Sequence, residues 1–248
     1  MYDIFTDYAF GQAERAQMDA DGHHVLPGIL TPPARADLTG ALARIDQLRG
    51  ELDDLPNRYA AEYDTYLASL IAHPQLVGLA RAILGDDVRY DHCVTLNRSG
   101  GNGGIGWHSH SYGEERPELG FVRIFFYVNG FTKDDGGLKV ICGSHLLRDH
   151  KLHGPADDDV RESWMRGKTN PNTGEEFAIE GLDAPAGTVV VMWTHAAHAV
   201  TPRQPGSDTR WCVVYAYRNP GRSSAARWIT EQFEQSPPSG AEALLPLY

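Results

Sequence analysis

The chain has 248 residues, of which 42% are hydrophobic and 22% are charged, as in an ordinary globular protein with a sizeable core. Its net charge of −11, with no run of lysines and arginines, argues against nucleic-acid binding. No segment approaches 18 apolar residues, and the start, MYDIFTDYAF, lacks the basic and apolar regions of a signal peptide. Cys93, Cys142 and Cys212 form no CxxC pattern, so we expect a cytoplasmic protein with reduced thiols and no membrane contact.

The first third of the chain is expected to be helical. Thr31 before two prolines is a typical helix start, and apolar residues follow at helical spacing: Leu38, Leu42, Ile45, Leu48 and Leu52. A second helix is predicted from about Tyr59 to Ile71, before the break at His73-Pro74. A short helix in PQLVGLARAIL should then end before Gly85.

From Val88 the pattern becomes that of strands. VRYDHCVTLN, FVRIFFYVNG, GLKVICGSH, GTVVVMWTH and RWCVVYAYR are β-branched and aromatic runs separated by turn residues. Helices followed by strands predict an α+β, mainly β protein, a barrel or jelly roll with a helical buttress. We expect one domain over residues 1–248: a buttress (1–87), a barrel (88–218) with a long loop (148–178), and a C-terminal helix and tail (219–248). A loop of that length is either a lid or partly disordered.

The stretch GWHSHSYG contains the pattern of a candidate metal site. On a strand, His108 and His110 would share one face and could bind one ion, although such a pair alone is weak evidence. The glycine-rich SGGNGGIG before it allows close approach of the backbone to a ligand, and we expect Trp107 and Tyr112 to wall the site. A third ligand must come from elsewhere, and GTVVVMWTHAAHAVTP offers His195 and His198.

Two strands carry arginines that alternation would turn toward a pocket. Arg210 begins a row of small residues, where its planar fork could hold a carboxylate, or it lies in solvent at the strand end. Arg123 and Tyr127 share one face of FVRIFFYVNG and could meet a substrate, or that face looks outward. Trp164, in the long loop, is a further candidate for closing over substrate.

These motifs together resemble those of the phytanoyl-CoA dioxygenase family of Fe(II)- and 2-oxoglutarate-dependent oxygenases, over most of the chain. DADGHHVLPGILTPPARADL is similar to the family's opening, and HPQLVGLARAILGDDV to the segment before its first barrel strand. WHSHSY stands where the family has Trp-His-x-Asp, and DDGGLKVICGSH resembles its NGPLxVxPGSH signature. AGTVVVMWTHAAH falls on the stretch that ends in the family's distal histidine.

The resemblance implies a double-stranded β-helix with N-terminal helices packed on one sheet, and Fe(II), 2-oxoglutarate and O2 as cofactor and cosubstrates. It implies that His108, His110 and His198 bind the metal and are catalytic, with His198 preferred to His195. Arg210 falls on the arginine that binds 2-oxoglutarate, and Asn97 is the best candidate for an additional hydrogen bond to it. Arg123, Tyr127, Trp107, Tyr112 and Trp164 are then expected to bind substrate.

Two residues depart from the family pattern. Cys142 replaces a proline, which we expect to be harmless, and His110 replaces the aspartate of the two-histidine, one-carboxylate triad. We expect an oxygenase that hydroxylates or otherwise oxidises a C–H bond of a small molecule at a three-histidine centre. The alternatives are a cupin-like three-histidine dioxygenase that uses no 2-oxoglutarate, and an inactive relative that only binds metal or a small molecule. Neither the substrate nor the oligomeric state follows from the sequence.

Overall fold

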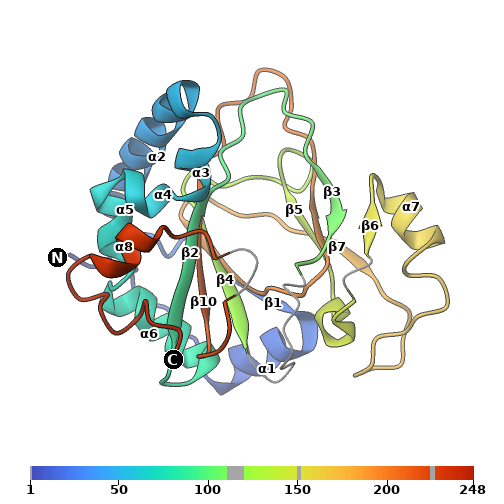
Figure 1. The fold of residues 1–248 in the computed structure, drawn as a ribbon. Helices are drawn as coiled ribbons and strands as arrows, with labels where there is room; N and C mark the ends of the chain where they lie inside the picture. The colour runs from blue at the N-terminus through green and yellow to red at the C-terminus, as the bar shows by residue number, and fades with distance from the viewer. Residues whose placement is uncertain (1, 111–119, 150–151, 224–226) are drawn as a thin grey trace.

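The computed structural model describes residues 2–110, 120–149, 152–223 and 227–248. Within these residues the strands form two five-stranded antiparallel sheets, which lie side by side in Figure 1. The major sheet consists of β1 (His23–Leu26), β8 (Thr188–Trp193), β4 (Phe121–Tyr127), β10 (Cys212–Arg218) and β2 (Arg89–Thr95), in that order. The minor sheet consists of β6 (His153–Gly154), β3 (Ile105–His108), β9 (His198–Val200), β5 (Leu138–Ile141) and β7 (Ile179–Gly181). This is the expected double-stranded β-helix.

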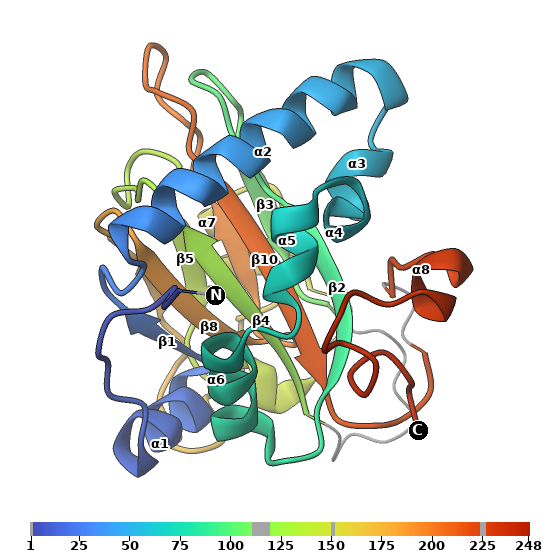
Figure 2. The ribbon, with the colours of Figure 1, turned by 90° about the vertical axis from the view of Figure 1, so that its left-hand side faces the viewer.

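Helices cover the outer face of the major sheet. They are α1 (Gln12–Asp21), α2 (Pro32–Leu52), α3 (Leu55–Arg58), α4 (Ala60–Tyr63), α5 (Thr65–Leu70) and α6 (Pro74–Leu84). Figure 2 shows α2, α5 and α6 in front of that sheet, and their apolar residues form one core with its strands. In the described part of the chain, no helix combines the length and apolarity needed to cross a membrane.

The helix starts and stops follow from local chemistry. As predicted, Thr31 caps α2, because its hydroxyl accepts a hydrogen bond from the amide of Ala34 at 3.4 Å. The single helix expected from Tyr59 to Ile71 is divided at Asp64, which has an extended backbone. The Asp64 carboxylate accepts from the amides of Tyr66 and Leu67 and so begins α5 as a new helix.

Alternation along β4 and β10 separates the helix-facing core from the interior between the sheets. Val122, Ile124, Phe126 and Val128 pack in the helix-facing core, together with Val213, Tyr215 and Tyr217. Phe125, Tyr127, Cys212 and Val214 pack on the interior side. The predicted alternation of both strands is thus confirmed.

The boundary expected at residue 88 does not separate helices from barrel. β1 lies within the helical N-terminal part, yet it forms the edge of the major sheet by antiparallel pairing with β8. The helix expected in the C-terminal part (219–248) is limited, among the described residues, to the short α8 (Glu231–Gln235).

The long segment 148–178 packs against the minor sheet. It contributes β6, the edge strand of the minor sheet, and α7 (Asp157–Glu162), which lies on the side away from the helices that cover the major sheet (Figure 1). Its residues Trp164, Met165 and Phe177 form a third core with Trp107 and Ile141. In its described residues, this segment is therefore part of the folded body rather than a disordered loop.

Candidate metal centre and cavity

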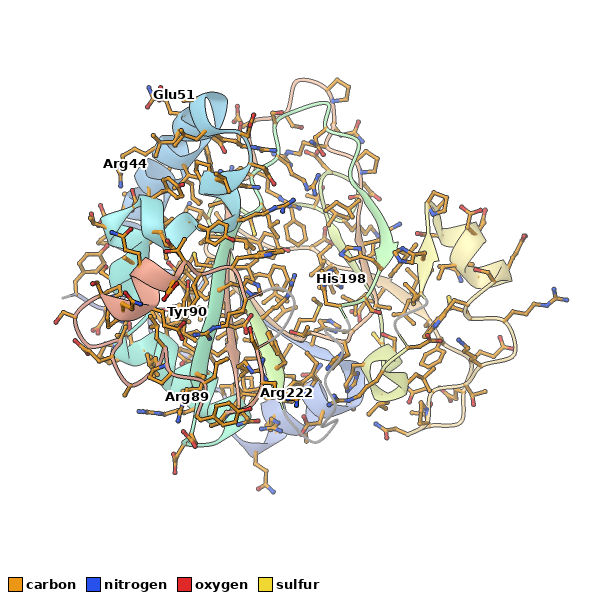
Figure 3. All side chains as sticks on the ribbon, viewed as in Figure 1. Arg44, Glu51, Arg89, Tyr90, His198 and Arg222 are labelled. Carbon is orange, nitrogen blue, oxygen red and sulfur yellow. The ribbon has the colours of Figure 1, made fainter. Side chains whose placement is uncertain are left out.

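Three histidines lie together where β3 pairs with β9. His108 at the end of β3 lies opposite His198 at the start of β9, and His110 follows two residues after His108. The ring centroids are 4.3 Å apart for His108 and His198, 4.9 Å for His108 and His110, and 5.1 Å for His110 and His198. One ring nitrogen from each lies within 4.8 Å of the other two. Figure 3 labels His198 in the space between the two sheets.

Backbone carbonyls orient two of the three rings. Nδ1 of His108 lies 2.9 Å from the carbonyl oxygen of Gly106, and Nδ1 of His198 lies 2.8 Å from that of Ala196. A carbonyl oxygen can only accept, so each Nδ1 carries the proton and donates it. The lone pair of each ring is then on Nε2, the arrangement that fixes the tautomer of metal-binding histidines.

The surroundings keep the imidazoles neutral. Burial lowers the pKa of His108 and lowers the pKa values of His110 and His198 well below the usual value. The positive charge of Arg123 lowers the pKa of all three further. At neutral pH a proton therefore does not compete with a metal for the ring nitrogens. Three neutral nitrogen donors at this spacing fit a divalent transition metal and leave coordination positions for other ligands.

A cavity of about 230 Å³ lies beside the histidine cluster, between the sheets. Its described apolar lining comes from both sheets: Val94, Leu96, Ile105, Phe125, Leu138 and Val200. Its described polar lining includes all three histidines of the cluster and several guanidinium groups. A cavity of this kind can hold a small, partly apolar molecule against a metal centre.

Arg210 lies in this cavity, just before β10. It is 1% exposed, and it donates a hydrogen bond to the carbonyl oxygen of Gly136. Its guanidinium lies over the ring of Tyr127, 5.4 Å from the centroid, and its Nε has no hydrogen-bond partner in the described part of the chain. The alternative of a solvent-exposed arginine at the strand end is therefore wrong. A buried guanidinium with an N–H group left over suits a carboxylate ligand.

Arg123 and Tyr127 line the same cavity from β4. Arg123 is 5% exposed and Tyr127 is 1% exposed, and Phe125 lies between them on the same strand face. The expectation that this face looks into the barrel is correct, and the outward-facing alternative is not. Sequence alternation thus grouped Arg123 and Tyr127 on one strand face, and the structure turns that face to the cavity.

Asn97, in contrast, does not reach the cavity. Its amide nitrogen donates to the carboxylate of Asp46 on α2 at 3.0 Å, and its oxygen accepts from the backbone amide of Cys212 at 3.2 Å. The Asn97 side chain therefore connects β10 to α2 through hydrogen bonds. This corrects the expectation that Asn97 contacts 2-oxoglutarate.

Arg98, the next residue, lines the cavity in its place. Its backbone pairs with that of Arg210, and its Nε has no hydrogen-bond partner among the described residues. Burial and the nearby charge of Arg210 lower the pKa of Arg98. Arg98 is not among the site residues predicted from the sequence, although alternation places Val94, Leu96 and Arg98 on one face.

The two tryptophans expected near substrate belong to the third core instead. Trp107 is 2% exposed and donates from Nε1 to Asp157 at 2.8 Å, because alternation on β3 turns it away from the face of His108. Trp164 donates from Nε1 to Asp149 at 2.9 Å, on the far side of the minor sheet. Neither lines the cavity, so both expectations are corrected.

Two further residues were candidates from the sequence, Tyr112 and His195. Tyr112 falls outside the described residues. His195 lies outside the cluster, with its Nε2 3.2 Å from a guanidinium nitrogen of Arg148. His145 also lies outside the cluster, and its Nε2 lies 3.1 Å from the carbonyl oxygen of Asp19.

Fold and site together define a double-stranded β-helix protein with a histidine cluster of metal-binding type between its two sheets. The chain belongs to the family described as "Phytanoyl-CoA dioxygenase (PhyH)", whose profile matches residues 12–207. The family resemblance found in the sequence is thereby confirmed.

Individual relatives are distant. An ectoine dioxygenase from Nocardia farcinica is 27% identical in an alignment of 179 residues that covers 65% of this chain and 60% of that protein. This chain thus spans less than two thirds of that relative's length. Among solved structures, the α-ketoglutarate-dependent carbocyclase SnoK matches with a TM-score of 0.68 and 17% identity, over 87% of this chain and 88% of that chain. EctD from S. alaskensis, with 2-oxoglutarate and 5-hydroxyectoine, matches with a TM-score of 0.65 and 19% identity, over 87% and 80%. These structural matches establish the fold.

Proposed function

We propose that the chain is a non-haem Fe(II)- and 2-oxoglutarate-dependent oxygenase that oxidises a C–H bond of a small molecule at a three-histidine centre. One observation carries the proposal: the histidine cluster and the buried guanidinium of Arg210 line the same cavity. The family, and relatives described as an ectoine dioxygenase and as EctD with 2-oxoglutarate, support the same activity.

Each residue then has a role that follows from its chemistry. His108, His110 and His198 would hold Fe(II) through one ring nitrogen each. Bound iron together with O2 and 2-oxoglutarate would supply the oxidising chemistry. Arg210 would bind the far carboxylate of 2-oxoglutarate through its planar fork, with the ring of Tyr127 against the guanidinium. The apolar lining would exclude water from the reacting atoms.

The cosubstrate-free alternative gives the guanidinium groups no role. A three-histidine dioxygenase that needs no 2-oxoglutarate has no use for an anion site beside its metal. Arg210 and Arg98 each leave a buried Nε without a hydrogen-bond partner among the described residues, which favours a carboxylate ligand between them.

An anaerobic titration tests the proposal. The protein is loaded with Fe(II), then titrated with 2-oxoglutarate, while the weak visible charge-transfer band of the iron–oxoglutarate complex is followed. We expect the band to appear and saturate. Iron binding without a band would support the cosubstrate-free alternative, and no iron binding would leave only a binding protein.

A further inference from the structure

A thiol, a carboxylate and an imidazole meet outside the cavity, where an edge strand of one sheet approaches an edge strand of the other. Sγ of Cys142, the residue after β5, lies 3.2 Å from Oε2 of Glu180 on β7. Nε2 of His23 on β1 lies 3.9 Å from the same oxygen. Since β1 is at the edge of the major sheet and β7 at the edge of the minor sheet, this thiol–imidazole cluster lies at the seam between them.

The pleat of the strands directs these side chains toward one another. Val140 packs in the interior core between the sheets, and Glu180 pairs directly with it. Cys142 is two residues beyond Val140, so Glu180 and Cys142 lie on the interior face of the minor sheet. On β1, His23 pairs with Met192, which packs in the same interior core. All three side chains therefore point into the space between the sheets.

His23 has an unused nitrogen in this cluster. The residue is 6% exposed, and its Nδ1 is buried with no hydrogen-bond partner in the described part of the chain. Its Nε2 is too far from Glu180 for a hydrogen bond. Burial lowers the pKa of His23, so the ring is neutral at pH 7 and has a lone pair to offer. A buried polar group of this kind indicates a ligand.

Two carboxylates make the surroundings of the cluster negative. The backbone carbonyl of Asp21 accepts a hydrogen bond from the amide of Gly143 at 2.9 Å, which holds Asp21 close to Cys142. Burial, together with the carboxylates of Glu180 and Asp21, raises the pKa of the Cys142 thiol to about 12. The thiol alone therefore keeps its proton at neutral pH. A cation that binds the sulfur would release this proton and balance the carboxylates.

The spacing of the cluster is close to that of metal ligands. Two ligands of a tetrahedral zinc ion, at about 2.0–2.3 Å from it, lie about 3.4–3.6 Å apart, between the two distances to Glu180. Among the described residues, only the three-histidine cluster has its ligand atoms all within 4.8 Å, so Cys142 and His23 are further apart than that. Binding therefore requires Cys142 to turn toward His23, and one change of staggered rotamer moves Sγ by about 3 Å.

We propose that Cys142, Glu180 and His23 form a second metal site, which binds Zn(II) or a similar cation with affinity for sulfur. Thiolate, carboxylate and imidazole are ligands of zinc, whereas Mg(II) and Ca(II) prefer oxygen alone. The ion takes the place of the thiol proton, which passes to solvent, and it joins β1 of the major sheet to β5 and β7 of the minor sheet. The site is independent of the proposed function, because it shares no residue with the three-histidine cluster or the cavity.

Co(II) is the probe, because its bond to a thiolate gives an intense near-ultraviolet charge-transfer band that histidine ligands do not give. Metal-free protein is kept reduced without O2 and titrated with Co(II). We expect two ions per chain, one of them with the sulfur band. Cys93 and Cys212 are 0% exposed, so the band reports on Cys142. Roughly equimolar Zn(II) should remove the band, and Mg(II) should not.

Variants assign the ligands of this second ion. Cys142→Ser should abolish the sulfur band and leave one Co(II) per chain. His23→Gln and Glu180→Gln should each raise the Kd of the ion that gives the band by about tenfold or more, since a ligand is lost. His24→Gln, at the next position of β1, and Glu176→Gln, at an exposed position before β7, are matched controls and should leave that Kd unchanged.

Three outcomes would overturn the inference: no sulfur band in the unaltered protein, a band that persists in Cys142→Ser, or unchanged Kd values in both glutamine variants of the ligands. The last would mean that Cys142 binds metal alone. If Cys142→Ser does not fold, Cys142→Ala and the glutamine variants decide. His108→Ala separates the two sites, because it should lose the ion without the sulfur band and keep the other.

Discussion

The two walls of the cavity differ in chemistry and in construction. The minor-sheet wall carries the imidazoles of His108, His110 and His198, on strands of four and three residues and the loop that follows β3. The major-sheet wall carries the guanidiniums of Arg98, Arg123 and Arg210, on or beside strands of seven residues backed by helices. Short strands depend on individual contacts to orient side chains, whereas long buried strands do so by their pleat. Metal binding and anion binding should therefore be separable by mutation.

The largest effect is expected on the minor-sheet wall. His108→Ala or His198→Ala removes one of three ligands and should weaken metal binding by roughly a hundredfold or more, beyond the loss typical of a supporting residue. Metal content after equilibrium dialysis checks this, with circular dichroism as the control for folding. Full iron occupancy in both variants would mean that the metal binds elsewhere.

On the major-sheet wall, Arg210→Lys should act on the cosubstrate alone. The change keeps the charge but loses the two-point fork, so the Kd of 2-oxoglutarate should rise about tenfold or more. Metal content should be unchanged, because Arg210 lies on the opposite wall. A parallel loss of metal would show that the two walls are coupled.

Asn97 and Arg98 are neighbours in the chain, but Arg98 lines the cavity and Asn97 contacts the helical layer. Arg98→Gln should weaken 2-oxoglutarate binding several-fold, because Arg98 lines the cavity. Asn97→Ala should leave that Kd unchanged and lower the free energy of unfolding by about 1–2 kcal/mol, since its bonds to Asp46 and Cys212 are lost. Urea denaturation and the anaerobic titration, run on both variants, give the comparison. If Asn97→Ala weakens 2-oxoglutarate binding and Arg98→Gln does not, Asn97 rather than Arg98 contacts the cosubstrate.

His145 tests how the end of the minor sheet is joined to α1. Burial lowers the pKa of His145 to about 4, against about 6.5 in an unfolded chain. As pH falls below 6.5 the unfolded state takes up the proton first, so this group lowers stability between pH 6.5 and 4. The loss is about 2 kcal/mol between pH 7.5 and 5. His145→Gln should lack this part of the pH dependence in urea denaturation. Identical pH profiles for both proteins would contradict it.

The smallest effect is expected outside both walls. Trp164→Phe removes the hydrogen bond to Asp149 and should cost about 1 kcal/mol of unfolding free energy. The Kd of 2-oxoglutarate should be unchanged, because Trp164 lies in the third core. A weaker affinity for 2-oxoglutarate would show instead that the described residues of the segment 148–178 close over the cavity.

Some site residues could be predicted from the sequence and others could not. On β4, period-two alternation was enough to group Arg123 and Tyr127 on one face, but only the structure shows that this face lines the cavity. Asn97 was misplaced because the family resemblance outweighed that rule, which favours Arg98. Trp107 was misplaced for a similar reason. It is adjacent to His108 in the chain, and successive side chains of a strand point to opposite faces of the sheet.

Other features depend on contacts that no local pattern encodes. The pairing of β1 with β8 joins distant parts of the chain, so the local pattern of residues 1–87 predicts only a mainly helical buttress. In the segment 148–178, Trp164, Met165 and Phe177 follow no regular period, and only the finished minor sheet provides their partners. The break at Asp64 results from a side chain that caps a new helix within a pattern that predicts one continuous helix.

The pairing of β1 with β8 has a consequence for how the protein is made. On the ribosome, β1 and the N-terminal helices emerge long before the strand that completes their sheet, and His108 before its partner His198 on β9. Pairing between distant segments closes large loops, so folding should be slow and should finish only after synthesis has passed β10. Until then the apolar sheet-facing side of the helices has no partner, and the nascent chain is open to aggregation. Slower synthesis at low temperature, or a chaperone that holds the unfinished chain, should therefore increase the yield of folded protein.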